Sequence, residues 1–489
     1  MTRLAAALAS MALLTAVGCS FAPSALQPSA AANDATVGVD APPIGPDFRD
    51  AAPPPDAGTQ TSTHADAAIA MDDAGVEADA APSLDDASAP DAAGGDAGPA
   101  NRDASSALPY VPSNLDPRDV ELVATAMPTI SVPNGGVCSI DSTGTGAIQG
   151  DCGSSAPASF RTAHMRDGYD AMLVVLRSLD VADRGELRLA GDRVIIFLVQ
   201  GNATIDGLVE AGGRGATMGP GQSRGCGLSA GAAGRNEQSG GGGGGGSYGT
   251  DGSPGRASGL GAARSPGGRA GTLPTPPIDP LRAGCPGGAG GDATAMLNGG
   301  SIGGLGGGGG GGVQISSGAR LRVTGSRFRG GSIQAGGGGG GGGHSRGGGG
   351  GGGGAGGTIV LEAVDLEIGE NTAVSVNGGA GAEGGSGVNY NGTTGNGGDG
   401  DDAQEGFDLA QTNAQVISGG DGAAGATIEA AATLGSEGSP AGNPSNDNTH
   451  GGGGGGGGGG LGRIKLRGIM CDLDPDAEVS GVIESTCPP

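Results

Sequence analysis

Branched apolar residues gather in five segments that share one pattern of hydrophobic and polar positions. Each segment predicts a strand, a kink, a second strand, a glycine-containing or acidic turn, and a third strand. The segments are MLVVLRSLDVADRGELRLAGD from Met172, VIIFLVQGNATIDGLVEAGG from Val194, VQISSGARLRVTGSRFRGGSIQAGG from Val313, TIVLEAVDLEIGENTAVSVNGG from Thr358, and RIKLRGIMCDLDPDAEVSGVIE from Arg463.

Alternation of apolar and polar residues predicts one apolar face for each strand. In the fourth segment this face is formed by Leu361, Leu366, Ile368, Val374 and Val376. One segment has too little apolar surface to fold alone, whereas stacked segments bury a continuous core. The pattern therefore predicts a mainly β chain in which residues 171–489 form a right-handed parallel β-solenoid, similar to a β-helix.

Glycine-rich tracts occupy one constant position in this pattern. They follow Ala211, Ala335 and Asn377, and the last tract ends just before Arg463. Insertions of variable length at one corner predict loops that project from one side of a regular scaffold. Residues 336–357 should accordingly join the third segment to the fourth.

The composition leaves two states open for these tracts. Glycine contributes 114 of 489 residues, aromatic residues are 2%, and tryptophan is absent, which excludes a conventional aromatic core. Ordering polyglycine costs about 1–2 kcal/mol per residue without burying a side chain, which favours slack loops. Chains without Cβ atoms can also pack backbone to backbone as extended threefold helices.

The Gly-Gly-X pattern between Gly212 and Gly462 resembles the polyglycine II bundles of phage tail-fibre adhesins and the glycine-rich PE-PGRS surface proteins. The resemblance lies in composition and spacing. It implies a structural or adhesive role at a cell surface.

The N-terminus predicts export. Arg3 precedes an apolar run, Leu4 to Ala16, that is too short to span a bilayer, so residues 1–18 are interpreted as a signal peptide. The sequence Ala16-Val17-Gly18-Cys19 resembles the lipobox of bacterial lipoproteins, although Ala16 stands where leucine is most common. The resemblance implies that Cys19 is lipidated and anchors the chain in the outer membrane or at the cell surface.

Two further regions precede the repeats. Residues 19–107 consist mainly of Ala, Asp, Pro and Ser, a composition that predicts a disordered acidic tether. Residues 108–170 have a more ordinary composition and are predicted to form a small cap. The signal, tether and glycine-rich repeats together resemble glycine-rich lipoproteins of Gram-negative, high-GC bacteria.

The remaining cysteines predict disulfides, because an even number of them lies in an exported chain. Sequential pairing would close one loop in each of three regions, while other connectivities remain open. A metal site is disfavoured because no CxxC pair is present. The candidates are Cys138, Cys152, Cys226, Cys285, Cys471 and Cys487.

Alignment of ARLRV with VDLEI predicts two cross-strand ion pairs, Arg320 with Asp365 and Arg322 with Glu367. Such pairs would help to set the register. The functional alternative is an Arg/Asp surface that binds or cleaves polysaccharide, as in pectate-lyase β-helices.

Two well-defined motifs of nucleotide binding and catalysis are missing from the sequence. It lacks a P-loop and an HExxH motif, and we predict no enzymatic activity and no cofactor. The formal net charge of −26 argues against nucleic-acid binding. Calcium remains an alternative at two acidic patches, Asp399 to Glu405 and Asp472 to Glu478.

The sequence therefore predicts a non-catalytic, lipid-anchored surface protein that acts as an adhesion, matrix or envelope-structural module. The expected partners are the membrane, through the lipid, and an extracellular polysaccharide or another cell surface. The alternatives are a carbohydrate-active β-helix and a calcium-stabilised display scaffold.

Overall fold

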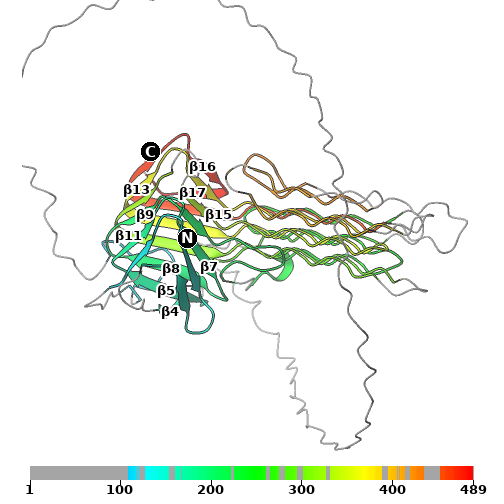
Figure 1. Ribbon diagram of the computed structural model, residues 1–489, viewed down its shortest axis with the longest axis horizontal. Helices are drawn as coiled ribbons and strands as arrows, with labels where there is room; N and C mark the ends of the chain where they lie inside the picture. The colour runs from blue at the N-terminus through cyan, green and yellow to red at the C-terminus, as the bar shows by residue number, and fades with distance from the viewer. Residues whose placement is uncertain are drawn as a thin grey trace, which may run out of the picture. The chain divides into compact units, whose positions relative to one another are not determined.

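The computed structural model describes most of the chain from Leu108 onward (Figure 1). The predicted signal peptide, Cys19 and the predicted tether lie outside the described residues. The described ranges are 108–117, 119–120, 127–153, 160–166, 168–221, 225–259, 265–274, 281–294, 301–325, 331–387, 395–404, 406, 408–412, 419–433, 435 and 452–487.

The chain is mainly β, and most strand pairs are parallel, which confirms this part of the predicted fold. The larger sheet contains β1 (Thr129–Val132), β6 (Ser178–Val181), β9 (Ala203–Ile205), β11 (Gly312–Val323), β13 (Thr358–Ile368), β15 (Arg463–Leu473) and β17 (Val482–Ser485), with β4 (Phe160–His164), β5 (Asp170–Leu176) and β8 (Val194–Val199). The smaller sheet contains β2 (Val137–Asp141), β3 (Ala147–Gly150), β7 (Glu186–Ala190), β10 (Leu208–Glu210), β12 (Ser332–Gln334), β14 (Ala373–Ser375) and β16 (Glu478–Ser480).

Each predicted segment contributes strands to both sheets, and equivalent positions lie side by side. Leu321 is in register with Leu366 in the larger sheet, and Ile333 is in register with Val374 in the smaller one. The first two segments contain the three predicted strands. From the third segment onward, the first two strands merge into one, and an irregularity between Ser317 and Arg320 marks the predicted kink.

Both sheets continue into residues 108–170, the region predicted as a small cap. β1 pairs in parallel with β6, and β2 pairs in parallel with β7, so this region adds one more layer to each sheet. The strand β1 can do so because its alternate residues Ile130 and Val132 are fully buried. Antiparallel strands β3 and β4 complete the region.

The main apolar core is built from inward side chains of the two sheets, including Ile130, Phe197, Leu361 and Ile464. A second cluster brings Leu108 and Leu115 against β5 and β8. These two residues belong to residues 108–117, which we call the leading segment. Within the described residues, no helix has the length and apolar content needed to cross a bilayer.

The glycine-rich segments between β10 and β11, between β12 and β13, and between β14 and β15 lie side by side as extended chains (Figure 1). We call them the glycine bundle. All three glycine-rich segments therefore leave the sheets, and return to them, at the one position in the repeat that the sequence predicted.

Candidate functional site

The chain from Gly348 to Gly357 lies at the centre of the glycine bundle. Every third N–H group donates to the same neighbouring chain, which is the pattern of a helix with three residues per turn. The N–O distances are 2.7–3.0 Å, and the donor–acceptor pairs are Gly349–Gly291, Gly352–Gly288 and Ala355–Cys285, then Gly350–Gly454, Gly353–Gly457 and Gly356–Gly460, then Gly351–Gly341, Gly354–Gly338 and Gly357–Ala335.

Three further chains donate to the carbonyl oxygens of this central chain. Gly243 donates to Gly350, Gly304 to Gly349, and Ala382 to Gly351. The central chain therefore has six neighbours, and its peptide groups are paired on all sides. In the described residues, the glycine tracts form an ordered, hydrogen-bonded bundle rather than slack loops.

Close approach of the backbones explains why the interior is glycine. A Cβ atom on Gly351 would lie closer than 3.0 Å to the carbonyl oxygen of Leu305, and one on Gly354 would meet Gly308 in the same way. Real Cβ atoms essentially never come so close to another atom. Larger residues consequently occupy outward positions, where Ile302 and Leu305 are 64% and 66% exposed.

A groove of about 720 Å³ runs along the surface of this bundle. Its floor is Gly339 to Gly342, one wall is Ile302 to Leu305, and the other wall is Asp399 to Asp402. Gly215 and Ala216 close one end. The exposed side chain of His344 also lines the groove. All of these are described residues, and the groove combines main-chain groups, two exposed aliphatic side chains, an imidazole and carboxylates.

Asp and Asn side chains at every third position of one wall cap the main chain of the floor. Asp402 Oδ1 accepts from the N–H groups of Gly339, at 2.9 Å, and Gly215, at 2.7 Å. Asp399 Oδ1 accepts from Gly342 N at 2.7 Å, and Asn396 Oδ1 accepts from Ser345 N at 2.8 Å.

The carboxylates of Asp399 and Asp402, which the sequence offered as calcium ligands, thus bind backbone N–H groups. In the second acidic patch, Asp474 Oδ1 accepts from Asp476 N at 2.8 Å. Across the described ranges, no cluster of three or more His, Cys, Asp or Glu side chains is arranged to hold a metal ion.

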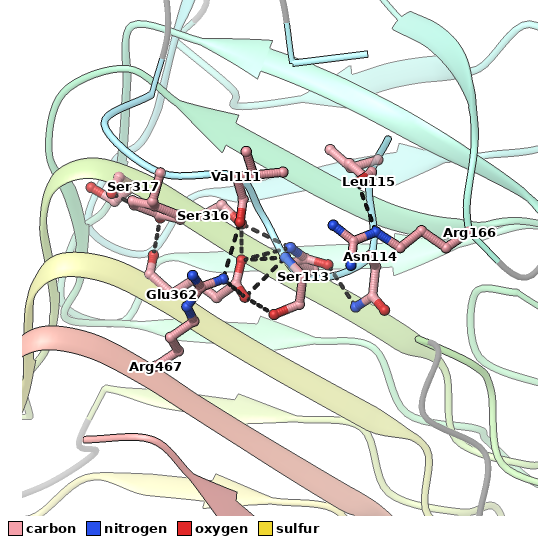
Figure 2. A network of polar contacts seen from close by, with 11 residues as sticks. Val111, Ser113, Asn114, Leu115, Arg166, Ser316, Ser317, Glu362 and Arg467 are labelled. Carbon is pink, nitrogen blue, oxygen red and sulfur yellow. Dashed lines mark hydrogen bonds and ion pairs between the residues drawn. The ribbon is translucent and has the colours of Figure 1, made fainter. Parts of the chain in front are cut away.

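A second polar cluster surrounds Glu362 on β13 (Figure 2). The Glu362 side chain has no exposed surface. Gln314 Nε2 donates to its Oε2 at 3.0 Å, and Ser316 Oγ donates to the same oxygen at 3.1 Å. Ser113 donates through both its N–H and its hydroxyl, and Arg467 Nη1 lies 3.6 Å from Oε1.

This cluster fastens the leading segment to the larger sheet. The Tyr110 hydroxyl lies 2.8 Å from Glu362 O and 3.0 Å from Ser317 O, and Arg467 Nη1 donates to Val111 O at 3.0 Å. Burial, followed by the Glu362 charge, raises the pKa of Tyr110 far above its ordinary value. Because protein groups already pair with the Glu362 carboxylate, we interpret the cluster as a structural latch.

Three disulfides join the candidate cysteines in the order of the sequence. The pairs are Cys138–Cys152, Cys226–Cys285 and Cys471–Cys487, with S–S distances of 2.07, 2.10 and 2.03 Å. The second disulfide lies in the glycine bundle, where Cys285 O also accepts from Ala355 N.

The structure also brings together the two candidate ion pairs. Arg320 is in register with Asp365, with an N–O distance of 2.6 Å, and Arg322 is in register with Glu367 at 3.0 Å. These side chains are partly exposed and pair with each other, which fits a role in setting the register.

Sequence reasoning missed both the groove and the Glu362 latch. The three-residue spacing of Asn396, Asp399 and Asp402 is a visible signal for the capped wall. The latch joins residues 249 positions apart and has no comparable signal. No protein-family model, curated protein or solved structure matches this chain.

Proposed function

We propose that the chain is a non-catalytic module of a bacterial cell surface, in which stacked repeats form a β-solenoid that displays the glycine bundle for adhesion or envelope structure. In this proposal Cys19 carries the lipid that holds the chain in the outer membrane. An extracellular polymer or another cell surface is the partner.

The observation that carries the proposal is the hydrogen-bonded packing of six chains around Gly348–Gly357. The central chain of this bundle carries no side chain larger than the methyl group of Ala355, so most of the bundle's chemistry lies at outward positions. Main-chain pairing in every direction makes the bundle stiff, and stiffness lowers the entropy cost of binding a partner. These properties suit a display surface better than a catalytic cleft, which needs several side chains to converge on one point.

Adhesion of cells that display the full chain tests this proposal. Gly351→Ala adds one methyl group inside the bundle, where it would strike Leu305 O. Ala233→Val adds methyl groups at an exposed outward position and is the matched control. We expect Gly351→Ala to abolish attachment and Ala233→Val to preserve it at equal surface abundance.

Two results would contradict the proposal. One is undiminished attachment by Gly351→Ala cells whose bundle has lost its amide protection. The other is release of reducing ends from an anionic polysaccharide by the purified protein, which would indicate a carbohydrate-active enzyme. Labelling with palmitate of the wild type but not of Cys19→Ala tests the anchor separately.

A further inference from the structure

The groove lies in line with a short chain of the glycine bundle, residues 212–215. We call the position of this chain, together with its extension along the groove, the row. Gly213 N donates to Gly336 O at 2.8 Å, and Gly308 N donates to Gly215 O at 2.7 Å. This short chain then reverses at a hairpin in which Arg214 and Thr217 exchange both backbone hydrogen bonds. Beyond the hairpin, no residue in the described ranges continues the row.

The two chains on either side of the row continue past the hairpin. On each of them, every third residue points a main-chain group toward the row. Gly339 O and Gly342 O are in phase with Gly336 O, and among the described residues no backbone N–H donates to either of them. The N–H group of Leu305 is in phase with that of Gly308, and within the same ranges no acceptor receives it. The open row therefore presents main-chain acceptors on one side and a main-chain donor on the other.

The positions of Cβ atoms locate the same open row independently. A Cβ on Gly338 would collide with Gly215 O of the hairpin chain. On Gly341, three residues later, the nearest atoms are Leu305 N at 3.1 Å and Leu305 O at 3.5 Å, both from the wall. Space thus opens beside Gly341 at the point where the protein's own chain turns away.

The first occupant of the row indicates which side chains it accepts. That occupant is Gly212-Gly213-Arg214, in which the glycines are half-buried or buried and the arginine is exposed. Arg214 Nη2 donates to Glu210 Oε2 at 3.1 Å. Further along the row, Asp399 and Asp402 line the wall, so an outward cation would again meet carboxylates.

We propose that this groove binds an extended glycine-rich polypeptide with a basic residue at every third position. The incoming chain would donate to Gly339 O and Gly342 O and accept from Leu305 N–H, extending the bundle by one chain in the way that an added strand extends a sheet edge. Two glycines in each triplet face bundle chains, and the third residue points outward toward the aspartates.

A labelled synthetic peptide of repeated Gly-Gly-Arg triplets tests the proposal with the full-length protein. Leu305→Pro deletes the donor and places the proline ring in the row, while the fixed φ of proline suits an extended threefold helix. Leu305→Ala removes the side chain but keeps the donor and is the matched control. We expect Leu305→Pro to weaken binding at least about tenfold, since it combines a lost hydrogen bond with a steric block, and Leu305→Ala to change it less than about threefold.

A peptide of Gly-Val-Arg triplets carries the same charge but has a side chain where the row requires glycine, and Gly-Gly-Glu triplets reverse the charge. Neither should bind. The proposal is overturned if no Gly-Gly-Arg binding occurs, if Gly-Val-Arg binds equally, or if Leu305→Pro binds as well as Leu305→Ala while both variants melt like the wild type. This test uses purified protein and does not depend on attachment of cells, so it can fail or succeed independently of the proposed surface role.

Discussion

Gly456 faces the carbonyl oxygen of Gly351 with no side chain between them, and a Cβ on Gly456 would lie closer than 3.0 Å to that oxygen. The two residues come from separate glycine tracts, one following β12 and the other preceding β15. Their contact shows that the tracts form one packed body. Order in each tract therefore depends on the others.

The interior of the glycine bundle should be intolerant of a single methyl group. Gly351→Ala forces an overlap with Leu305 O, and overpacking of this kind costs about 1–3 kcal/mol of unfolding free energy. Gly341→Ala is the control on a hydrogen-bonded neighbour, because its Cβ would meet no atom closer than 3.1 Å. Urea unfolding should show a clear loss for the first variant and a small change for the second. Equal losses would contradict the assigned packing.

The Glu362 latch should hold the leading segment against the sheet. Glu362→Ala leaves Ser113 N–H and the Ser316 hydroxyl without their acceptor and removes one of the two acceptors of Gln314 Nε2, and buried groups left unpaired cost about 1–3 kcal/mol. Limited proteolysis should then cut near residues 108–115. Glu367→Ala, on the same strand but in a partly exposed ion pair, should change stability by less than about 1 kcal/mol. Resistance of Glu362→Ala to cleavage would argue against the latch.

Stability should fall at alkaline pH through Tyr110. Burial raises the pKa of Tyr110 above its ordinary value of 10.0, so the folded state keeps the phenol proton where the unfolded state releases it. The contribution is fully present below pH 10.0 and is lost as the pH rises further. The free energy of unfolding, measured against pH, should decline more steeply above this value for the wild type than for Tyr110→Phe.

Tyr248 is also buried, and burial raises its pKa as well, so part of the alkaline decline should persist in Tyr110→Phe. Its hydroxyl lies 2.9 Å from Thr358 Oγ1. If the pH profile of Tyr110→Phe matches that of the wild type, Tyr110 has the same pKa in the folded and unfolded states, which would contradict this account.

The disulfide in the glycine bundle should matter most for stability. Cys226–Cys285 spans 59 residues and Cys471–Cys487 spans 16, and a longer closed loop restricts the unfolded chain more. Replacing both cysteines of the first pair by serine should cost about 2–4 kcal/mol in urea unfolding. The corresponding double variant of the second pair should lose less. A larger loss from the second pair would contradict this ordering.

Much of the sheet arrangement follows from the repeats. The pairing of Arg320 with Asp365 could be predicted because the apolar residues on either side of them coincide when the segments are aligned. The corner at which the glycine tracts leave was visible for the same reason. The predicted break between the first two strands is confirmed in the first two segments, whereas β11 and β13 run through the kink without interruption.

The sequence alone could not predict whether the glycine tracts are ordered. The conformational entropy of glycine favours a flexible coil, whereas the hydrogen bonds that order the tracts come from chains distant in sequence. Gly351 donates to Gly341, which is close in sequence, but Gly350 donates to Gly454. The groove is even harder to predict from the sequence. It exists only because the chain that enters the row at Gly212 turns back at Gly215. The latch likewise depends on Ser113 meeting Glu362.

Backbone amide hydrogen exchange across Gly336–Gly357 tests the central claim most directly. The packed bundle predicts strong protection of the amides of Gly349 to Gly357, comparable to that of β13, because each donates to a neighbouring chain. The N–H group of Leu305, for which the described residues supply no acceptor, should exchange quickly by comparison. Exchange of the Gly349 to Gly357 amides at the rate of an unstructured chain would contradict the bundle.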